Sequence, residues 1–264
     1  MSEKSYVRCD IDDRGVATVF MTRAEIHNAF DEQLIAELIS TFQEIASDER
    51  IRVVVFGGEG KSFSAGADLN WMRRVADYSE SENFEDAKTV AQLMAVIASS
   101  PKPVVARVHG AVFGGGVGLV SACDIAIGSD LAIFSLSEVK LGLIPATISP
   151  FVIRAIGARQ AGRYMVSGER FGADEALRIG LLHKVISADD LDDTVENMVS
   201  ELLKNGPQAM RESKELIACV MNRTIDKSIM DETAHHIARV RASDEGKEGL
   251  SAFLGKRAPA WLNI

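Results

Sequence analysis

Two glycine-rich segments and one glutamate are the residues of this sequence that could take part in a reaction. The first segment, residues 114–118, reads Gly-Gly-Gly-Val-Gly and lies between an apolar stretch, 104–108, and a stretch with helical character, 119–123. Glycines let a ligand approach bare backbone, and free N–H groups at the start of a helix attract a partly negative oxygen. The run is thus typical of an oxygen-binding site, although a tight turn alone would also explain it.

A second loop of the same kind lies upstream, at residues 57–68. It reads Gly-Gly-Glu-Gly-Lys-Ser-Phe-Ser-Ala-Gly-Ala-Asp and follows the apolar stretch 53–56. Asp68 is placed to cap a helix that runs through Leu69 and Val75. Each loop can offer one backbone N–H to the same carbonyl oxygen, and such a pair forms an oxyanion hole for an enolate or a tetrahedral intermediate.

Nucleotide-binding motifs are incomplete in both loops. Gly60-Lys61-Ser62 is similar to the end of a phosphate-binding P-loop, but Val55 occupies the position of the required first glycine. The other run lacks the third glycine of a dinucleotide fingerprint, because Leu119 and Ser121 stand at the two possible positions. We therefore exclude both classes of nucleotide site.

Glu138 is the candidate for proton transfer. Its neighbours in sequence include Leu136, Val139 and Leu141, and apolar surroundings favour the neutral form of a carboxyl group. A raised pKa suits a general acid near neutral pH. The alternative interpretation is an ordinary surface or helix-capping glutamate.

The elements that must position these residues follow an alternating pattern. Residues 6–11 and 16–21 flank the turn 12–15 and predict a hairpin. Apolar residues at helical spacing predict an amphipathic helix over 31–46. Strands and helices alternate to about residue 137, which indicates an α/β core.

The rest of the chain is mostly helical. Helices are predicted at 188–204, 207–221 and 226–241. The acidic segment 77–86 is predicted to be a mobile loop. We expect two parts, a core over 1–187 and a C-terminal helical subdomain over 188–264.

Composition narrows the class of protein. With 264 residues and 47% hydrophobic content, the chain can bury a large core. Residues 1–6 lack the features of a leader peptide, and no run of about 18 apolar residues predicts a membrane span. Three separated cysteines suggest a reducing compartment, and the net charge of -9 argues against nucleic-acid binding. We expect a cytoplasmic protein with no nucleic-acid or membrane partner.

Several segments resemble the enoyl-CoA hydratase/isomerase (crotonase) superfamily. The resemblance is carried by residues 63–69, 109–111 with 114–116, and 123–126, and it continues at 134–145, 168–176 and 248–261. It implies a crotonase fold, which is an α/β spiral core of β-β-α units with a C-terminal helical subdomain. In such proteins the core, here 1–187, holds the acyl-CoA, and the helical part contacts CoA and forms trimers or hexamers. Segments 135–138 and 145–151 are most similar to members of the 3-methylglutaconyl-CoA hydratase type.

The resemblance also implies roles for individual residues. The N–H groups of Ala67 and Gly115 would form the oxyanion hole, and Glu138 would transfer protons. Contacts with the acyl chain or CoA are implied for Ala24, Ile26, Ala65, Gly66, Asp68, Leu69, Gly114, Gly118, Pro145, Phe253 and Lys256. No cofactor is expected beyond the CoA of the substrate, and no metal.

Gly118 departs from the family pattern, because hydratases of this family carry a first catalytic glutamate there. Our hypothesis is that Gly118 vacates volume and charge for a branched or carboxylated acyl chain; close packing is the alternative explanation. We expect hydration of a 2-enoyl-CoA such as 3-methylglutaconyl-CoA. The rival reaction is Δ3,Δ2-enoyl-CoA isomerisation by the single glutamate.

Other functions receive less support from the sequence. One relative in the superfamily binds AU-rich RNA through a lysine-studded first helix, but helix 31–46 has no lysine to contact phosphate. Loss of catalysis is disfavoured because Glu138 and both loops are intact. His235 and His236 lack an acidic or cysteine partner at ligand spacing, so no metal site is predicted. Four cations could pair with a substrate carboxylate, namely Arg73, Arg74, Lys140 and Arg154.

Overall fold

A six-stranded sheet forms the centre of the protein. The computed structural model describes residues 5–262; residues 1–4, part of the segment in which we expect no leader, lie outside that range. The strands are ordered β1-β2-β3-β4-β6-β9. They are β1 (Val7–Ile11), β2 (Val16–Met21), β3 (Val53–Gly58), β4 (Val104–Val108), β6 (Ile125–Ser129) and β9 (Lys184–Ile186). β1 and β2 form the predicted antiparallel hairpin, and the other neighbours are parallel.

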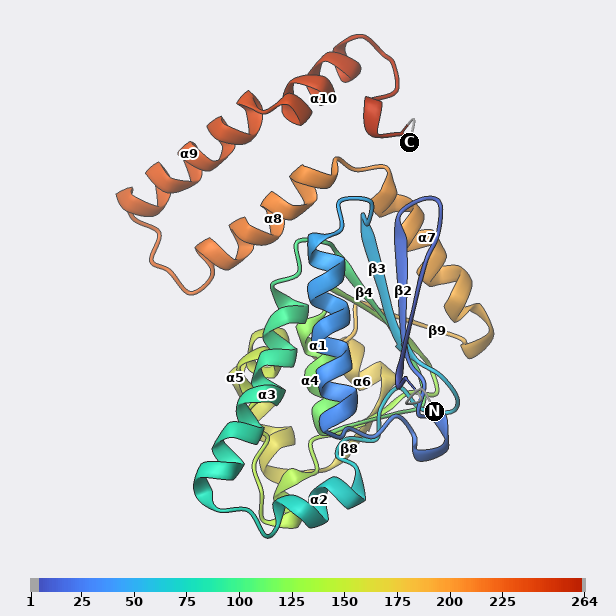
Figure 1. Cartoon of the computed structure of the whole chain (residues 1–264). Helices are drawn as coiled ribbons and strands as arrows, with labels where there is room; N and C mark the ends of the chain where they lie inside the picture. The colour runs from blue at the N-terminus through green and yellow to red at the C-terminus, as the bar shows by residue number, and fades with distance from the viewer. Residues whose placement is uncertain (1–4, 263–264) are drawn as a thin grey trace.

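Helices cover both faces of this sheet (Figure 1). In β3, Val54 and Phe56 face the core that contains α1 (Glu32–Ser47), α3 (Glu80–Ala98), α4 (Gly115–Ala122) and α5 (Ser149–Ser167). Val53 and Val55 face the other side, where Leu191, Val195 and Val199 of α7 (Leu191–Leu203) pack against them. Successive side chains of a strand point to opposite faces, so an unbroken apolar run suits a sheet buried on both sides. The α/β expectation is confirmed, and α7 packs on the core.

A second, smaller sheet lies where the chain leaves the main one. It contains β5 (Ala111–Phe113), β7 (Ile133–Ser135) and β8 (Arg170–Gly172). Two isolated parallel bridges, Phe30 to Ala67 and Ser64 to Val112, extend it. The chain therefore repeats a long strand, a short strand and a helix, as in β4-β5-α4 and β6-β7-α5. This repeat is the predicted spiral of β-β-α units, and it brings the two glycine-rich loops side by side.

The remaining helical segments are short. These are α2 (Leu69–Val75), α6 (Ala173–Arg178) and the 3-10 turns η1 (Ala24–Ile26), η2 (Glu138–Leu141), η3 (Ala188–Asp190) and η4 (Ala260–Leu262). None of the helices within residues 5–262 combines the length and the apolar character needed to cross a bilayer.

The predicted mobile loop at 77–86 is wrong for most of its length. Helix α3 begins at Glu80, and Ser79 caps it by accepting a hydrogen bond from the Glu82 N–H at 3.3 Å. The Glu82 carboxylate in turn accepts from the Ser79 N–H at 2.8 Å, which completes a capping box. Two of the acidic residues that suggested a loop, Glu80 and Glu82, instead lie in the first turn of a helix, where negative charge is favourable.

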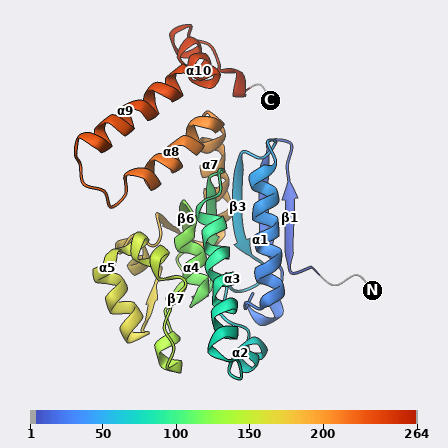
Figure 2. The ribbon, with the colours of Figure 1, turned by 60° about the vertical axis from the view of Figure 1, so that its left-hand side comes forward.

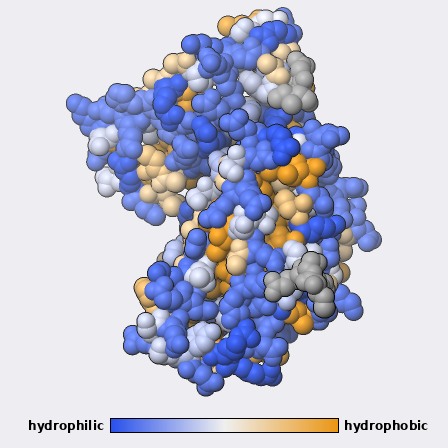
Figure 3. Space-filling view, viewed as in Figure 1, coloured by the Kyte–Doolittle hydropathy of each residue, from blue (hydrophilic) through white to orange (hydrophobic). Residues whose placement is uncertain are grey.

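The last three helices form an arm that stands away from the core (Figures 1 and 2). They are α8 (Pro207–Val220), α9 (Lys227–Ala242) and α10 (Asp244–Leu254). In the space-filling view the molecule is hollowed on one side between arm and core (Figure 3). The Arg52 guanidinium ties the base of the arm to the core by donating to the carbonyls of Leu203 at 2.8 Å, Asn205 at 3.0 Å and Trp261 at 3.1 Å.

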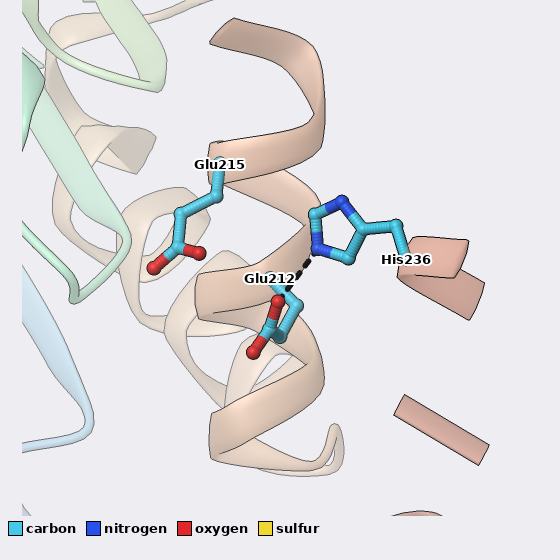
Figure 4. Close-up of side chains that lie close together, drawn as sticks. All are labelled: Glu212, Glu215 and His236. Carbon is cyan, nitrogen blue, oxygen red and sulfur yellow. Dashed lines mark hydrogen bonds and ion pairs between the residues drawn. The ribbon is translucent and has the colours of Figure 1, made fainter. Parts of the chain in front are cut away.

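A buried carboxylate joins α8 to α9 (Figure 4). Both oxygens of Glu212 accept hydrogen bonds from the Arg239 guanidinium at 2.6 Å, and His236 Nε2 lies 2.6 Å from Oε2. The hydrogen bonds from Arg239 lower the pKa of Glu212 from 4.5 to about 2. Because the folded-state pKa is depressed, this stabilisation is present above about pH 4.5 and is lost as the pH falls toward about 2.

We predict that Glu212→Gln lowers the free energy of unfolding at pH 7 by about 2 kcal/mol, because it removes a buried charge-assisted pair. Glu215→Gln is the matched control, since Glu215 is exposed on the same helix and lies 3.7 Å from Arg211. Thermal unfolding followed by circular dichroism at pH 7 and pH 3 measures both variants. Equal effects of the two substitutions at pH 7 would contradict a role for the buried pair.

Candidate active site

A parallel bridge leaves the N–H of Ala67 free. The Phe30 N–H donates to the Gly66 carbonyl at 2.7 Å, and the Phe30 carbonyl accepts from the Asp68 N–H at 2.7 Å. In such a bridge the residue between the two bonded neighbours turns its own N–H away from the partner strand. Within residues 5–262 the N–H of Ala67 has no hydrogen-bond partner. It is therefore available to a ligand.

The second free donor is the N–H of Gly115. Helix α4 begins at this residue, earlier than the sequence predicts, and the first N–H groups of a helix have no acceptor within it. The preceding Gly114 has a φ of 51° and donates its own N–H to the Ser135 carbonyl at 2.9 Å. In the described part of the chain the Gly115 N–H has no partner.

Close packing brings the two donors into one place. A methyl group added to Gly66 would lie 3.1 Å from the Phe113 carbonyl oxygen and 4.0 Å from the Gly114 nitrogen. One added to Gly115 would lie 2.3 Å from Cε2 of the buried Phe30. Position 115 therefore has no room for a side chain. The ring that fills the space belongs to Phe30, the residue that pairs with Ala67.

Glu138 lies beside these donors. Its Oε1 is 3.0 Å from the position that a methyl group on Gly114 would occupy. Its Oε2 is buried and has no hydrogen-bond partner within residues 5–262. Burial raises the pKa of this carboxyl above its ordinary value of 4.5, as the apolar neighbours predict. An unpartnered carboxyl oxygen in an apolar site can accept or deliver a proton.

The space expected at Gly118 does not exist. A methyl group added there would lie 2.3 Å from Cγ2 of Ile148 and 3.2 Å from the sulfur of Met94, and both side chains are buried. Ile148 therefore fills the volume that our hypothesis assigned to the acyl chain. Close packing, the alternative explanation, accounts for the glycine. The hypothesis of a vacated pocket at Gly118 is wrong for this reason.

The remaining candidate residues fall into two groups. Ala65, Gly66 and Asp68 belong to the glycine-rich loop 57–68, Leu69 begins α2 directly after it, and Ala24 lies at the edge of the loop, 2.7 Å from the position of a methyl group on Gly60. Ile26 follows in η1, while Pro145 is buried in the segment after η2. Phe253 and Lys256 lie at the end of α10, on the arm, whereas α2 lies at the opposite end of the molecule (Figure 1). One chain does not bring these two residues to the site.

Sequence reasoning missed the residues that anchor the glycine-rich loop 57–68. His27 and Asn28 have left-handed φ values of 57° and 53°, which are uncommon outside glycine. The Asn28 amide donates to the carbonyls of Glu59 at 2.9 Å and Ser62 at 2.8 Å, and the Ala65 N–H donates to the His27 carbonyl at 2.9 Å. The tolerance of asparagine for this conformation was the available signal.

Three of the four cations proposed for a substrate carboxylate have other contacts within the described chain. Arg74 pairs with Glu32 at 2.6 Å, and Arg73 donates to the Asn70 side chain at 2.6 Å. Arg154 lies 5.9 Å from the centroid of the Phe151 ring. These contacts single out none of them as a carboxylate receptor.

The expectation that His236 lacks an acidic partner is wrong, because α8 brings Glu212 and Glu215 beside it (Figure 4). Their ligand atoms lie within 4.8 Å of one another. Both oxygens of Glu212, however, accept hydrogen bonds from Arg239. The guanidinium therefore already supplies the positive charge at this position, and the cluster serves as an ion-pair network.

Comparisons with known proteins agree with this architecture. The chain matches the family described as enoyl-CoA hydratase/isomerase over residues 12–263. A curated enoyl-CoA hydratase from Alternaria alternata is 31% identical over 258 residues, which cover 95% of this chain and 82% of that protein.

Two solved structures share the whole fold. An enoyl-CoA hydratase from Shewanella pealeana is 45% identical with a TM-score of 0.94, covering 97% of this chain and 96% of that one. One from Mycobacterium smegmatis is 34% identical with a TM-score of 0.92, covering 98% and 100%. The predicted crotonase fold is confirmed. The chain belongs to the enoyl-CoA hydratase/isomerase family, an enzyme family of the crotonase superfamily.

Proposed function

We propose that this enzyme adds water across the 2,3 double bond of an acyl-CoA thioester, a branched or carboxylated one such as 3-methylglutaconyl-CoA. One observation carries the proposal: within residues 5–262, the carboxyl of Glu138, whose Oε2 has no hydrogen-bond partner, lies beside Gly114, next to the free N–H groups of Ala67 and Gly115. The hydratase names of the relatives support the reaction class. The choice of acyl chain rests on the resemblance of segments 135–138 and 145–151.

The two N–H groups would act on the thioester oxygen. Hydrogen bonds from Ala67 and Gly115 draw electrons toward that oxygen, so the β-carbon of the enoyl group becomes electrophilic. When water attacks the β-carbon, negative charge develops on the oxygen of the resulting enolate. Preorganised donors stabilise this charge, and loss of one donor typically costs about 3 kcal/mol of transition-state stabilisation.

Glu138 would move the proton. Its carboxylate takes a proton from water while the new carbon–oxygen bond forms, and the protonated group then delivers a proton to the α-carbon of the enolate. The product gains a hydroxyl on the β-carbon and a hydrogen on the α-carbon, so one water is added. Burial, which raises the pKa of Glu138, favours the neutral acid that the second step requires.

The packing at Gly118 favours a second candidate reaction. Ile148 and Met94 occupy the space beside Gly118, so α4 contributes no second carboxylate there. A single glutamate suffices for double-bond isomerisation: Glu138 would remove a proton from the α-carbon of a 3-enoyl-CoA and return one to the γ-carbon. Water is not consumed in this reaction, and the products of the two reactions therefore differ in mass.

CoA binding and assembly complete the proposal. Ala24, Ile26 and the loop from Ala65 to Leu69 would contact the CoA moiety, with Gly114 and Pro145 bordering the acyl chain. Phe253 and Lys256 would reach the CoA of a neighbouring subunit in a trimer or a dimer of trimers. The apolar side chains exposed on the arm of the single chain support such an assembly: Ile237 is 48% exposed, Leu254 79% and Phe253 81%.

The proposed reaction predicts a product that is heavier than its substrate by one water. Purified protein is incubated with crotonyl-CoA, 3-methylglutaconyl-CoA or a 3-enoyl-CoA, and products are identified by mass. We expect hydration, fastest on the carboxylated substrate. Conversion of the 3-enoyl-CoA to its 2-enoyl isomer without any water gain would contradict the hydratase and support the isomerase.

In the same assay, Glu138→Gln should lower kcat by about 10² to 10⁴, the usual contribution of a positioned acid or base. The wild-type kcat/KM should fall on the acid side of its pH profile at a pH above 4.5, because acid protonates the base at its raised pKa. The Glu138→Gln variant should lack this fall in kcat/KM at acid pH. Glu85→Gln, at an exposed residue of α3 that pairs with Lys88, is the control. Full turnover in Glu138→Gln would remove this residue from the mechanism.

Close packing at Gly118 predicts that Gly118→Ala lowers the free energy of unfolding by about 1 to 3 kcal/mol, because the new methyl overlaps Ile148. The loss should be smaller in the background Ile148→Ala, a coupling of at least about 0.5 kcal/mol in a double-mutant cycle. Gly162→Ala is the control, since a methyl there meets no atom within 4 Å in α5. Urea unfolding measures the four proteins of the cycle and the control, and additive losses at Gly118 and Ile148 would contradict the contact.

Assembly is checked by light scattering on a sizing column. A mass of three or six chains is expected, and Phe253→Asp should lower it because the exposed ring would be buried against another subunit. A wild-type mass of one chain, 28.6 kDa, would contradict the proposed assembly.

A further inference from the structure

Arg23 is buried next to Asp68, the last residue of the glycine-rich loop 57–68, with 8% of its surface exposed. One terminal nitrogen of its guanidinium lies 2.8 Å from Asp31 Oδ2 and also donates to the Ala29 carbonyl at 2.8 Å. The other lies 3.2 Å from Asp68 Oδ2. The group is stacked 4.4 Å from the centroid of the Tyr6 ring. One cation therefore joins two carboxylates and a main-chain carbonyl.

Both carboxylates are helix caps. Asp31 accepts the Leu34 N–H on Oδ1 at 2.9 Å and so caps α1. Asp68 accepts the Asn70 N–H on Oδ1 at 2.7 Å and so caps α2. Each carboxylate uses one oxygen for its helix and the other for Arg23. The guanidinium thus fixes the starts of two helices relative to each other.

The bridge that frees the Ala67 N–H lies directly before these two caps. Phe30 precedes Asp31, Ala67 precedes Asp68, and the two are paired. A change in the distance between the caps would shift Ala67 against Phe30 and turn its N–H. The direction of one oxyanion donor therefore depends on the Arg23 contacts.

We propose that Arg23 is a positioning residue for catalysis: through the cap carboxylates of Asp31 and Asp68 it holds the Ala67 N–H in line with the thioester oxygen. This inference rests on the proposed role of Ala67. Arginine suits the task because its planar fork addresses two carboxylates in fixed directions, whereas the ammonium of lysine is a point charge on a flexible stem.

A stabilising role alone makes a different prediction. Buried ion pairs often add little net stability, since desolvation offsets their attraction. A merely structural Arg23 would change unfolding and leave the bound thioester unchanged. A positioning Arg23 acts on the carbonyl itself, and a spectroscopic readout of that carbonyl separates the two roles.

The test compares Arg23→Lys with Arg50→Lys in the full-length protein. Arg50 is the control because its side chain is 81% exposed and pairs with Asp48. The readouts are kcat, KM and the infrared stretch of a ¹³C-labelled carbonyl in a bound, unreactive saturated acyl-CoA. In the wild type we expect a lower carbonyl frequency than in water, since two donors polarise the bond. In Arg23→Lys we expect about half of that lowering and a kcat reduced about 10- to 100-fold, with little change in KM.

The outcomes separate the inference from the proposed function. A polarised carbonyl in the wild type that stays equally polarised in Arg23→Lys, with kcat unchanged, overturns the role of Arg23 and leaves the oxyanion hole intact. No polarisation in the wild type overturns both. If Arg23→Lys fails to fold, Asp31→Asn decides, because asparagine still caps α1 but gives up the charge that faces Arg23. A reduced carbonyl shift in Asp31→Asn supports the inference, and wild-type values overturn it.

Discussion

The parallel bridge between Phe30 and Ala67 is the constraint on which the site depends. It uses the hydrogen-bonding groups on either side of Ala67, and the N–H of Ala67 itself has no partner among residues 5–262. The same Phe30 presses its ring against Gly115, the residue that supplies the second free N–H. One buried aromatic residue thus contacts both donor positions. The spiral of β-β-α units brings Ala67 and Gly115 together around it.

Dense packing also determines which positions in the site have room for a carboxylate. Gly114 leaves room for the carboxyl of Glu138, while the volume beside Gly118 is closed by Ile148. Within residues 5–262, the position at Gly118 therefore adds no second carboxylate beside that of Glu138, whose pKa is raised by burial. If Glu138 is the group that moves every proton, as we propose, hydration and isomerisation are the two candidate reactions.

Local features of the fold were readable from the sequence. Capping by Asp68, the first hairpin and the buried strands follow from turn chemistry and periodicity, and Glu138 lies where its apolar neighbours suggested. Contacts between distant segments were not readable. Ile148 fills the space at Gly118 from thirty positions away, and Glu212 meets His236 across two helices. The capping box at Ser79 and Glu82 was a readable signal, but the acidic composition of its segment led to the wrong prediction.

The most direct test of the account is a crystal structure with an unreactive acyl-CoA thioester bound. We expect the thioester oxygen to lie about 2.7 to 3.1 Å from the backbone nitrogens of both Ala67 and Gly115, with the Glu138 carboxyl facing the α- and β-carbons. A thioester oxygen bound away from either nitrogen, or an acyl chain that leaves Glu138 out of reach, would contradict it.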